Sequence, residues 1–262
     1  MLISPSKKLT ISLQALCCLA FISTATPSIA QSCIAKSGDK ITPVIELYTS
    51  EGCSSCPPAD KWLSTFKDAA PSSQANPATP VVQAFHVNYW DYIGWTDRFA
   101  TPAHTTRQRQ VSAWQNSRSI YTPQVVRNGR DLSNWSRASA AQSGSELAPV
   151  SISLKQERSD IFSAEITPQA TAGVTWSAPW AAYWTVTEHG HSSKVLRGEN
   201  SGEQLKHDFV VRQYQPAGER QGAAKLALQT IARDAAHPRQ INLVIFNPQT
   251  GKPLQAVSLS CG

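Results

Sequence analysis

The sequence lacks the features that mark several classes of protein. After the first thirty residues, no segment is long and apolar enough to cross a membrane as a helix. The 24 basic and 18 acidic residues give a net charge of +6, but the basic residues form no clustered stripe. A nucleic-acid-binding surface needs such a stripe. We therefore expect no nucleic-acid partner, and no membrane partner once a leader is removed.

Cysteine is also scarce, and its spacing argues against one class of metal site. The chain has 6 cysteines, of which Cys53 and Cys56 stand at C-x-x-C spacing directly after an apolar run. A zinc knuckle needs a second such pair, whereas Cys33 and Cys261 stand singly and far apart. The Cys53/Cys56 pair therefore favours a reversible dithiol over half of a zinc site.

The first thirty residues read as a secretory signal. Lys7 and Lys8 form a positive start, residues 9–21 are apolar, and residues 28–30 form a small-x-small cleavage site. The apolar stretch is too short, and too often interrupted by serine and threonine, for a full membrane span. We expect cleavage after Ala30 and a periplasmic or secreted mature protein.

Export implies an oxidising compartment, where disulfides persist. Cys53 and Cys56 can pair locally, which leaves Cys33 near the mature N-terminus and Cys261 next to last. A structural disulfide between Cys33 and Cys261 would tie the two ends together and close nearly the whole chain. The alternative is that each of these two cysteines is free or intermolecular.

Residues 31–148 alternate strand and helix signals. The segments are a strand at 41–48, a helix at 57–66, a strand at 81–87, a helix at 97–117, and a strand from 121 that ends in a hairpin turn at Asn128–Gly129. This order predicts an α/β domain, a mixed sheet flanked by helices.

The composition changes near residue 149. Short alternating apolar runs follow at 150–154, 161–166, 181–187, 209–214, 225–230, 241–246 and 254–259. Evenly spaced short strands without helical periodicity predict a β-rich, sandwich-like second domain over 149–262.

The position of the dithiol favours a thioredoxin-like fold for the first domain. Cys53 and Cys56 stand where a strand passes into a helix, and Thr122-Pro123 enters a later strand as a candidate cis-proline. Unpaired N–H groups and the dipole of the helix start favour a thiolate. We expect Cys53 to be the nucleophile, Cys56 the resolving thiol, and Pro123 part of the site.

Other polar residues near this motif have two interpretations each. Glu46 is either a proton acceptor for Cys56 or an exposed strand-edge carboxylate. His86 is either a core histidine or a functional group, as a third metal ligand beside the cysteines or as an acid/base group. The aromatic segment that holds Trp90 and Asp91 either lines a substrate groove together with Thr122 or packs as core.

Several motifs together resemble one family. They are VIELYTSEGCSSCPPAD at 44–60, FHVNYWDYIGW at 85–95, Arg107, YTPQVVRNG at 121–129, Gly198-Glu199-Asn200, Gly202, Leu205, His207 and Val210-Val211-Arg212. The chain resembles the exported thioredoxin-like proteins of the domain-of-unknown-function family twelve-twenty-three. The resemblance implies a thioredoxin-like first domain, a β-rich second region and export, but it assigns no reaction.

The sequence departs from that family pattern in two places. Asn88 stands where the family has an aspartate, and the stretch after Gly129 lacks a glycine-bearing hairpin end. Glu199, Asn200, His207 and Arg212 form either a network that faces the dithiol or a turn followed by solvated charges.

The leading functional hypothesis is an exported thiol–disulfide oxidoreductase without a cofactor. Its partners would be thiols or disulfides of exported proteins, or a redox partner protein. A second hypothesis is copper delivery through Cys53, Cys56 and His86, because soft thiolates select Cu(I). A third is a non-catalytic binding module with a structural Cys53–Cys56 disulfide.

Overall fold

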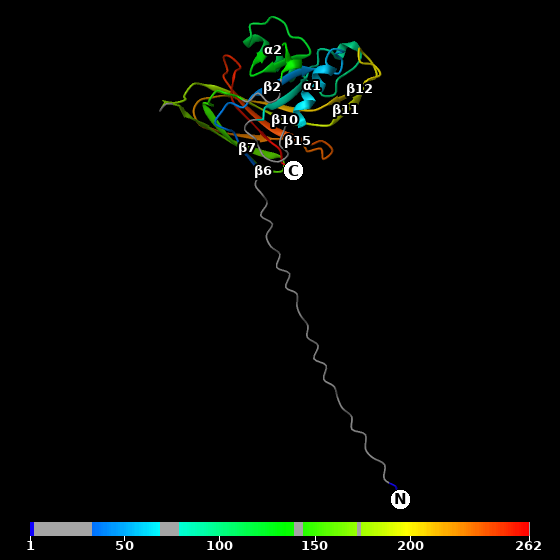
Figure 1. The fold of residues 1–262 in the computed structure, drawn as a ribbon, viewed down its shortest axis with the longest axis vertical. Helices are drawn as coiled ribbons and strands as arrows, with labels where there is room; N and C mark the ends of the chain where they lie inside the picture. The colour runs from blue at the N-terminus through cyan, green and yellow to red at the C-terminus, as the bar shows by residue number, and fades with distance from the viewer. Residues whose placement is uncertain (3–32, 69–78, 139–143, 172–173, 262) are drawn as a thin grey trace. The chain divides into compact units, whose positions relative to one another are not determined.

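A computed structural model describes residues 1–2, 33–68, 79–138, 144–171 and 174–261 (Figure 1). The predicted signal sequence, apart from its first two residues, lies outside this part of the chain. Residues Ser32–Gly262 form one compact unit.

The largest element is a sheet in which eight strands run in the order β16-β15-β10-β13-β3-β2-β4-β5. From one edge to the other, the strands are β16 (Pro253–Leu259), β15 (Arg239–Phe246), β10 (Trp180–Glu188), β13 (Val210–Arg220), β3 (Val81–His86), β2 (Val44–Thr49), β4 (Gln124–Arg127) and β5 (Arg130–Asp131). Strand β3 pairs in parallel with both of its neighbours, β2 and β13, and the other neighbouring strands pair antiparallel.

Smaller sheets complete the strand content of the described residues. A four-stranded sheet has the order β1-β6-β7-β14, with β1 at Ile34–Lys36, β6 at Val150–Arg158, β7 at Ile161–Pro168 and β14 at Ala224–Gln229. Two hairpins form two-stranded sheets: β11 (His191–Lys194) with β12 (Gln204–His207), and β8 (Ala170–Thr171) with β9 (Val174–Thr175).

Two α-helices are present in the described part of the chain, α1 at Pro57–Asp68 and α2 at Pro102–Trp114. Two short 3-10 helices lie at Asp91–Ile93 and Trp135–Arg137. Neither α-helix is long and apolar enough to span a membrane. The Thr101 side chain accepts a hydrogen bond from the His104 N–H, which caps α2 before its first-turn proline.

The predicted fold class is wrong. The described residues are mostly strand, and no separate thioredoxin-like α/β domain flanked by helices is present. The strands of the two predicted halves share one sheet, because β13 pairs with β3 at Val210 and Ala84. Apolar alternation locates a strand and its buried face, but it does not specify which sheet edge that strand joins.

The central strands are buried on both faces. On β2, Ile45 and Leu47 pack with residues of α1, whereas Val44 and Tyr48 pack in a cluster that includes Val111 of α2. Alternate residues of a strand point to opposite faces, so α1 and α2 cover opposite sides of β2 (Figure 1). A third cluster fills the space between the four-stranded sheet and strands β10, β15 and β16.

This alternation separates Glu46 from the cysteines. Glu46 shares its face of β2 with Val44 and Tyr48, on the α2 side. Its carboxylate lies 3.0 Å from Arg107 Nη2 and accepts a hydrogen bond of 2.8 Å from the Tyr183 hydroxyl. The side chains of Glu46 and Arg107 are 3% and 4% exposed, so this is a buried ion pair. Glu46 thus joins α2 to the sheet.

The chain ends are also joined. Cys33 and Cys261 form a disulfide across 228 residues of sequence, with their Cα atoms 6.0 Å apart. In the chain-entropy model, closing so long a loop restricts the unfolded chain strongly and contributes roughly 5 kcal/mol to stability.

Replacing one partner of the Glu46–Arg107 pair should destabilise the protein strongly. We expect R107M to lower the free energy of unfolding by about 3–5 kcal/mol, because Glu46 is left buried without its cation. The matched control R109M changes an exposed arginine of the same helix and should cost less than about 0.5 kcal/mol. Urea unfolding measures both. Equal effects would show that the buried pair does not anchor α2.

Candidate functional site

The Cys53–Cys56 disulfide immediately precedes α1, with the two Cα atoms 5.4 Å apart. Two turns precede the helix, with hydrogen bonds from the Cys53 N–H to Ser50 O and from the Cys56 N–H to Cys53 O. The Ser55 hydroxyl lies 3.3 Å from Cys53 Sγ, which can only accept in the disulfide. Neither cysteine has exposed surface.

The start of α1 offers few backbone donors to a thiolate. Its first two residues, Pro57 and Pro58, have no N–H. The N–H groups of Ala59 and Asp60 both donate to the Cys56 carbonyl. Stabilisation of a thiolate therefore depends on the helix dipole and on neighbouring side chains more than on free N–H groups of this first turn.

A turn from the second half of the chain covers the disulfide segment. The Glu199 carboxylate accepts a hydrogen bond of 3.0 Å from the Ser54 N–H, which lowers the pKa of Glu199. The buried Asn200 amide donates to the carbonyls of Glu51 and Cys53, at 2.8 and 3.0 Å. We call residues Gly198–Gly202 the covering turn.

The predicted groove residues flank the same segment. A Cβ at Gly52 would lie 3.0 Å from Trp90 Cβ, so the loop before Cys53 packs closely against Trp90. Trp90 Nε1 donates to Thr122 Oγ1 at 2.7 Å, and the Thr122–Pro123 peptide bond is cis. Asp91 accepts a hydrogen bond from the Asp97 N–H at 3.2 Å, which positions the loop after β3.

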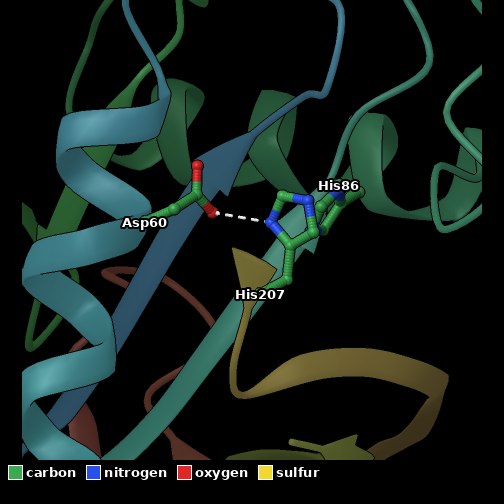
Figure 2. A group of neighbouring side chains, drawn as sticks. All are labelled: Asp60, His86 and His207. Carbon is green, nitrogen blue, oxygen red and sulfur yellow. Dashed lines mark ion pairs between the residues drawn. The ribbon is translucent and has the colours of Figure 1, made fainter. Parts of the chain in front are cut away.

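A buried histidine lies beside α1, between two carboxylates. His207, at the end of β12, has Nδ1 3.5 Å from Asp60 Oδ1 and Nε2 3.4 Å from Glu51 Oε1. Figure 2 shows Asp60 directed from α1 toward the His207 ring. Asp60 also accepts a hydrogen bond of 2.8 Å from the Thr49 hydroxyl. The ends of β2 and β12, the first turn of α1 and the loop residue Glu51 thus meet around the His207 ring.

His86 forms a second histidine–carboxylate pair next to the first. Its Nδ1 lies 2.6 Å from Asp97 Oδ2, and both side chains are fully buried. Asp97 also accepts hydrogen bonds from the N–H groups of Glu51 and Phe99, each at 2.9 Å. The His86 and His207 rings pack edge to face, with centroids 4.9 Å apart.

These contacts shift several pKa values. Burial opposes ionisation of His207, Asp97 and Glu51, but the contacts between the histidines and the carboxylates outweigh the effect of burial on each pKa. Asp60 and Glu51 raise the pKa of His207 to about 10, and His86 lowers the pKa of Asp97 to about 2. The close contact with His207 also lowers the pKa of Glu51. The site therefore holds buried charge within one helical turn of Cys56.

The structure brings some of the predicted residues together and separates others. Cys53 and Cys56 lie beneath Glu199 and Asn200, whereas Glu46 is on the far face of β2. His86 is grouped with Asp60 and His207, and Arg212 pairs with Glu188 instead, at 3.5 Å.

Asp60, Glu51 and Asp97 were not singled out from the sequence. For Asp60 a signal was available: it stands four residues after Cys56, in the first turn of the helix that begins directly after that cysteine.

Weakening the covering turn should expose the disulfide. We expect N200A to leave the buried Glu51 carbonyl without its side-chain donor and to remove one of the two donors of the Cys53 carbonyl. The change should cost about 1–3 kcal/mol and speed reduction of Cys53–Cys56 by a small dithiol. The control S201A alters an exposed serine of the same turn. Thiol alkylation followed by mass spectrometry gives the reduction rate. A rate equal in N200A and the unmodified protein would show that this turn does not limit access.

Two solved structures have a similar fold. Protein AGR_C_4864 from Agrobacterium tumefaciens matches with a TM-score of 0.60 and 22% identity, over 85% of this chain and 96% of that one. HBP35 of Porphyromonas gingivalis matches with a TM-score of 0.55 and 13% identity, over 85% of this chain and 76% of that one. At these identities the likeness concerns the fold alone.

No curated protein matches the chain. A family profile does match, over residues 44–247, which span the disulfide, the covering turn and most of the large sheet. The chain therefore belongs to the family described as protein of unknown function, DUF1223.

Proposed function

We propose that the protein is an exported thiol–disulfide oxidoreductase that uses the Cys53/Cys56 pair. The observation that carries this proposal is a disulfide at the start of α1 with a buried charged cluster one helical turn away. A disulfide that served only to close a loop would need no such ionic neighbours, and buried charges are costly to maintain.

The proposed exchange passes through a mixed disulfide between Cys53 and the substrate. A thiolate of a substrate dithiol attacks Cys53 Sγ, the Cys53–Cys56 bond breaks, and Cys56 leaves as a thiolate and takes up a proton. The second substrate thiolate then attacks the substrate sulfur of the mixed disulfide and releases Cys53. Two electrons and two protons pass from the substrate to the protein, and the substrate leaves as a disulfide. The reverse sequence reduces a substrate disulfide.

Asp60 replaces Glu46 as the carboxylate available for proton exchange with Cys56. Asp60 stands four residues after Cys56, in the first turn of α1. Glu46 points to the other face of the sheet, where Arg107 and Tyr183 hold its carboxylate. Asp60 lies 3.5 Å from His207, in a site shielded from water.

Access to Cys53 requires movement of the covering turn. Both sulfur atoms are buried, and the hydrogen bonds of Glu199 and Asn200 to residues 51–54 are among the contacts over them. We propose that a substrate backbone displaces this turn and lies against Trp90, Asp91, Thr122 and Pro123. Substrates would then be extended segments of exported proteins that carry thiols or disulfides.

The cysteine arrangement supports an exported location. Four cysteines occur in the described residues, and all four are paired in disulfides. Such pairing persists in oxidising compartments and is rare in the cytosol. Together with the signal-like first thirty residues, this supports a mature protein that acts in the periplasm or outside the cell.

Replacing Cys56 should trap the exchange halfway. We expect C56S to accumulate mixed disulfides between Cys53 and exported proteins, because no resolving thiol remains to release them. The matched control is the double variant C53S/C56S, which keeps the Cys33–Cys261 disulfide and should form none. Non-reducing gels and mass spectrometry of exported extracts identify the adducts.

Two results together would count against the proposal. They are the absence of Cys53 adducts in C56S and the failure of the unmodified protein to oxidise a model dithiol or reduce a model disulfide. That outcome would assign the Cys53–Cys56 disulfide to a structural role.

A further inference from the structure

Three buried side chains from three different elements converge next to the disulfide. Asp60 comes from α1, His86 from the end of β3, and His207 from the end of β12 (Figure 2). Each offers one ligand atom, and these atoms all lie within 4.8 Å of one another. All three residues are buried, with exposed fractions of 7%, 0% and 3% respectively.

The imidazole nitrogens in this group lack hydrogen-bond partners. Among the described residues, none makes a hydrogen bond to His86 Nε2 or to either ring nitrogen of His207. The two carboxylates beside His207 lie at 3.4 and 3.5 Å, in ion-pair contact but without hydrogen-bond geometry. Buried polar atoms are nearly always satisfied, so several such atoms in one place require an explanation.

Each of the three side chains also contacts an oxygen atom of a residue outside the group. Asp97 lies 2.6 Å from His86 Nδ1, and the Thr49 hydroxyl donates to Asp60 Oδ2 at 2.8 Å. Glu51 lies 3.4 Å from His207 Nε2. Metal-binding histidines characteristically donate their other ring N–H to a carboxylate, which fixes the ring and its tautomer. His86 has such a carboxylate in Asp97, and Glu51 lies beside His207 Nε2 in ion-pair contact.

This arrangement leaves three atoms for one ion: His86 Nε2, His207 Nδ1 and Asp60 Oδ1. His207 Nδ1 and Asp60 Oδ1 are 3.5 Å apart. Ligands in a tetrahedral zinc site, with bonds of about 2.0–2.1 Å, are separated by about 3.4 Å. The charges also suit a cation, because the carboxylates of Glu51, Asp60 and Asp97 surround only two imidazoles.

We propose that Asp60, His86 and His207 bind a divalent transition-metal ion. Two imidazoles and one carboxylate form a borderline donor set that suits Zn²⁺ and its spectroscopic substitute Co²⁺, and three protein ligands leave one position open. The set contains no thiolate, so binding does not require reduction of the Cys53–Cys56 disulfide. It differs in this from a copper site made by Cys53, Cys56 and His86.

The proposal is tested on the oxidised, chelator-treated protein, with the metal alone as probe. Calorimetric titration with Zn²⁺ should show one ion bound per chain, and Co²⁺ should give a visible absorption band that Zn²⁺ removes. D60N and H207Q should weaken Zn²⁺ binding at least 100-fold. D97N, which alters the partner of His86, should weaken it about 10- to 100-fold.

Two controls separate this site from other sources of binding. H237Q removes a partly buried histidine that lies outside the group. This variant should bind Zn²⁺ with the same affinity as the unmodified protein. C53S/C56S should also bind normally, so failure of the exchange activity and failure of metal binding are distinguishable. Far-UV circular dichroism checks that each variant is folded.

The unmodified protein decides the question even if a variant does not fold. No saturable binding of Zn²⁺ or Co²⁺ by the unmodified protein would overturn the proposal. Binding that survives both D60N and H207Q, or that is lost in C53S/C56S, would place the metal elsewhere and would overturn it equally.

Discussion

The parallel pairing of β13 with β3 is the contact on which the site depends. It is short, with Val210 opposite Ala84 and a hydrogen bond of 2.8 Å from the Ala84 N–H to the Phe209 carbonyl. His207 stands only three residues before Val210, so this pairing brings its ring to the start of α1. The covering turn connects β11 to β12, so the same pairing also positions this turn. One join between the two halves of the sequence thus completes both the charged cluster and the cover of the disulfide.

The two faces of β2 contact different helices. One face carries Glu46, whose pairing with Arg107 and Tyr183 fixes α2 to the sheet. The other face meets α1, and Thr49 at the end of the strand holds the carboxylate of Asp60. A polar residue in an apolar strand therefore does not identify the reactive site by itself. Successive side chains of a strand point to opposite faces, so the position of the residue decides which face of the sheet it lies on.

The local elements could be predicted from the sequence, whereas their assembly could not. The segments predicted at 41–48, 57–66 and 81–87 correspond to β2, α1 and β3, and Asn128–Gly129 is the turn between β4 and β5. Counting cysteines left Cys33 and Cys261 either paired with each other or unpaired within the chain, and the structure pairs them. The shared sheet was missed because periodicity is a local signal, and the pairing of β3 with β13 joins residues more than a hundred positions apart. Asp60 and His207 were missed as a pair for the same reason.

The central claim is that Cys53–Cys56 is an exchanging disulfide and not a permanent link. Its reduction potential, measured by equilibration of the purified protein with a dithiol buffer, tests this most directly. Because a buried charged cluster lies one helical turn from the pair and the covering turn contacts the residues over it, we expect a potential above about −300 mV, within the range of exchanging disulfides. The Cys33–Cys261 disulfide serves as the internal reference and should stay oxidised in the same buffers. A potential for Cys53–Cys56 well below about −300 mV would contradict the account and mark the disulfide as structural.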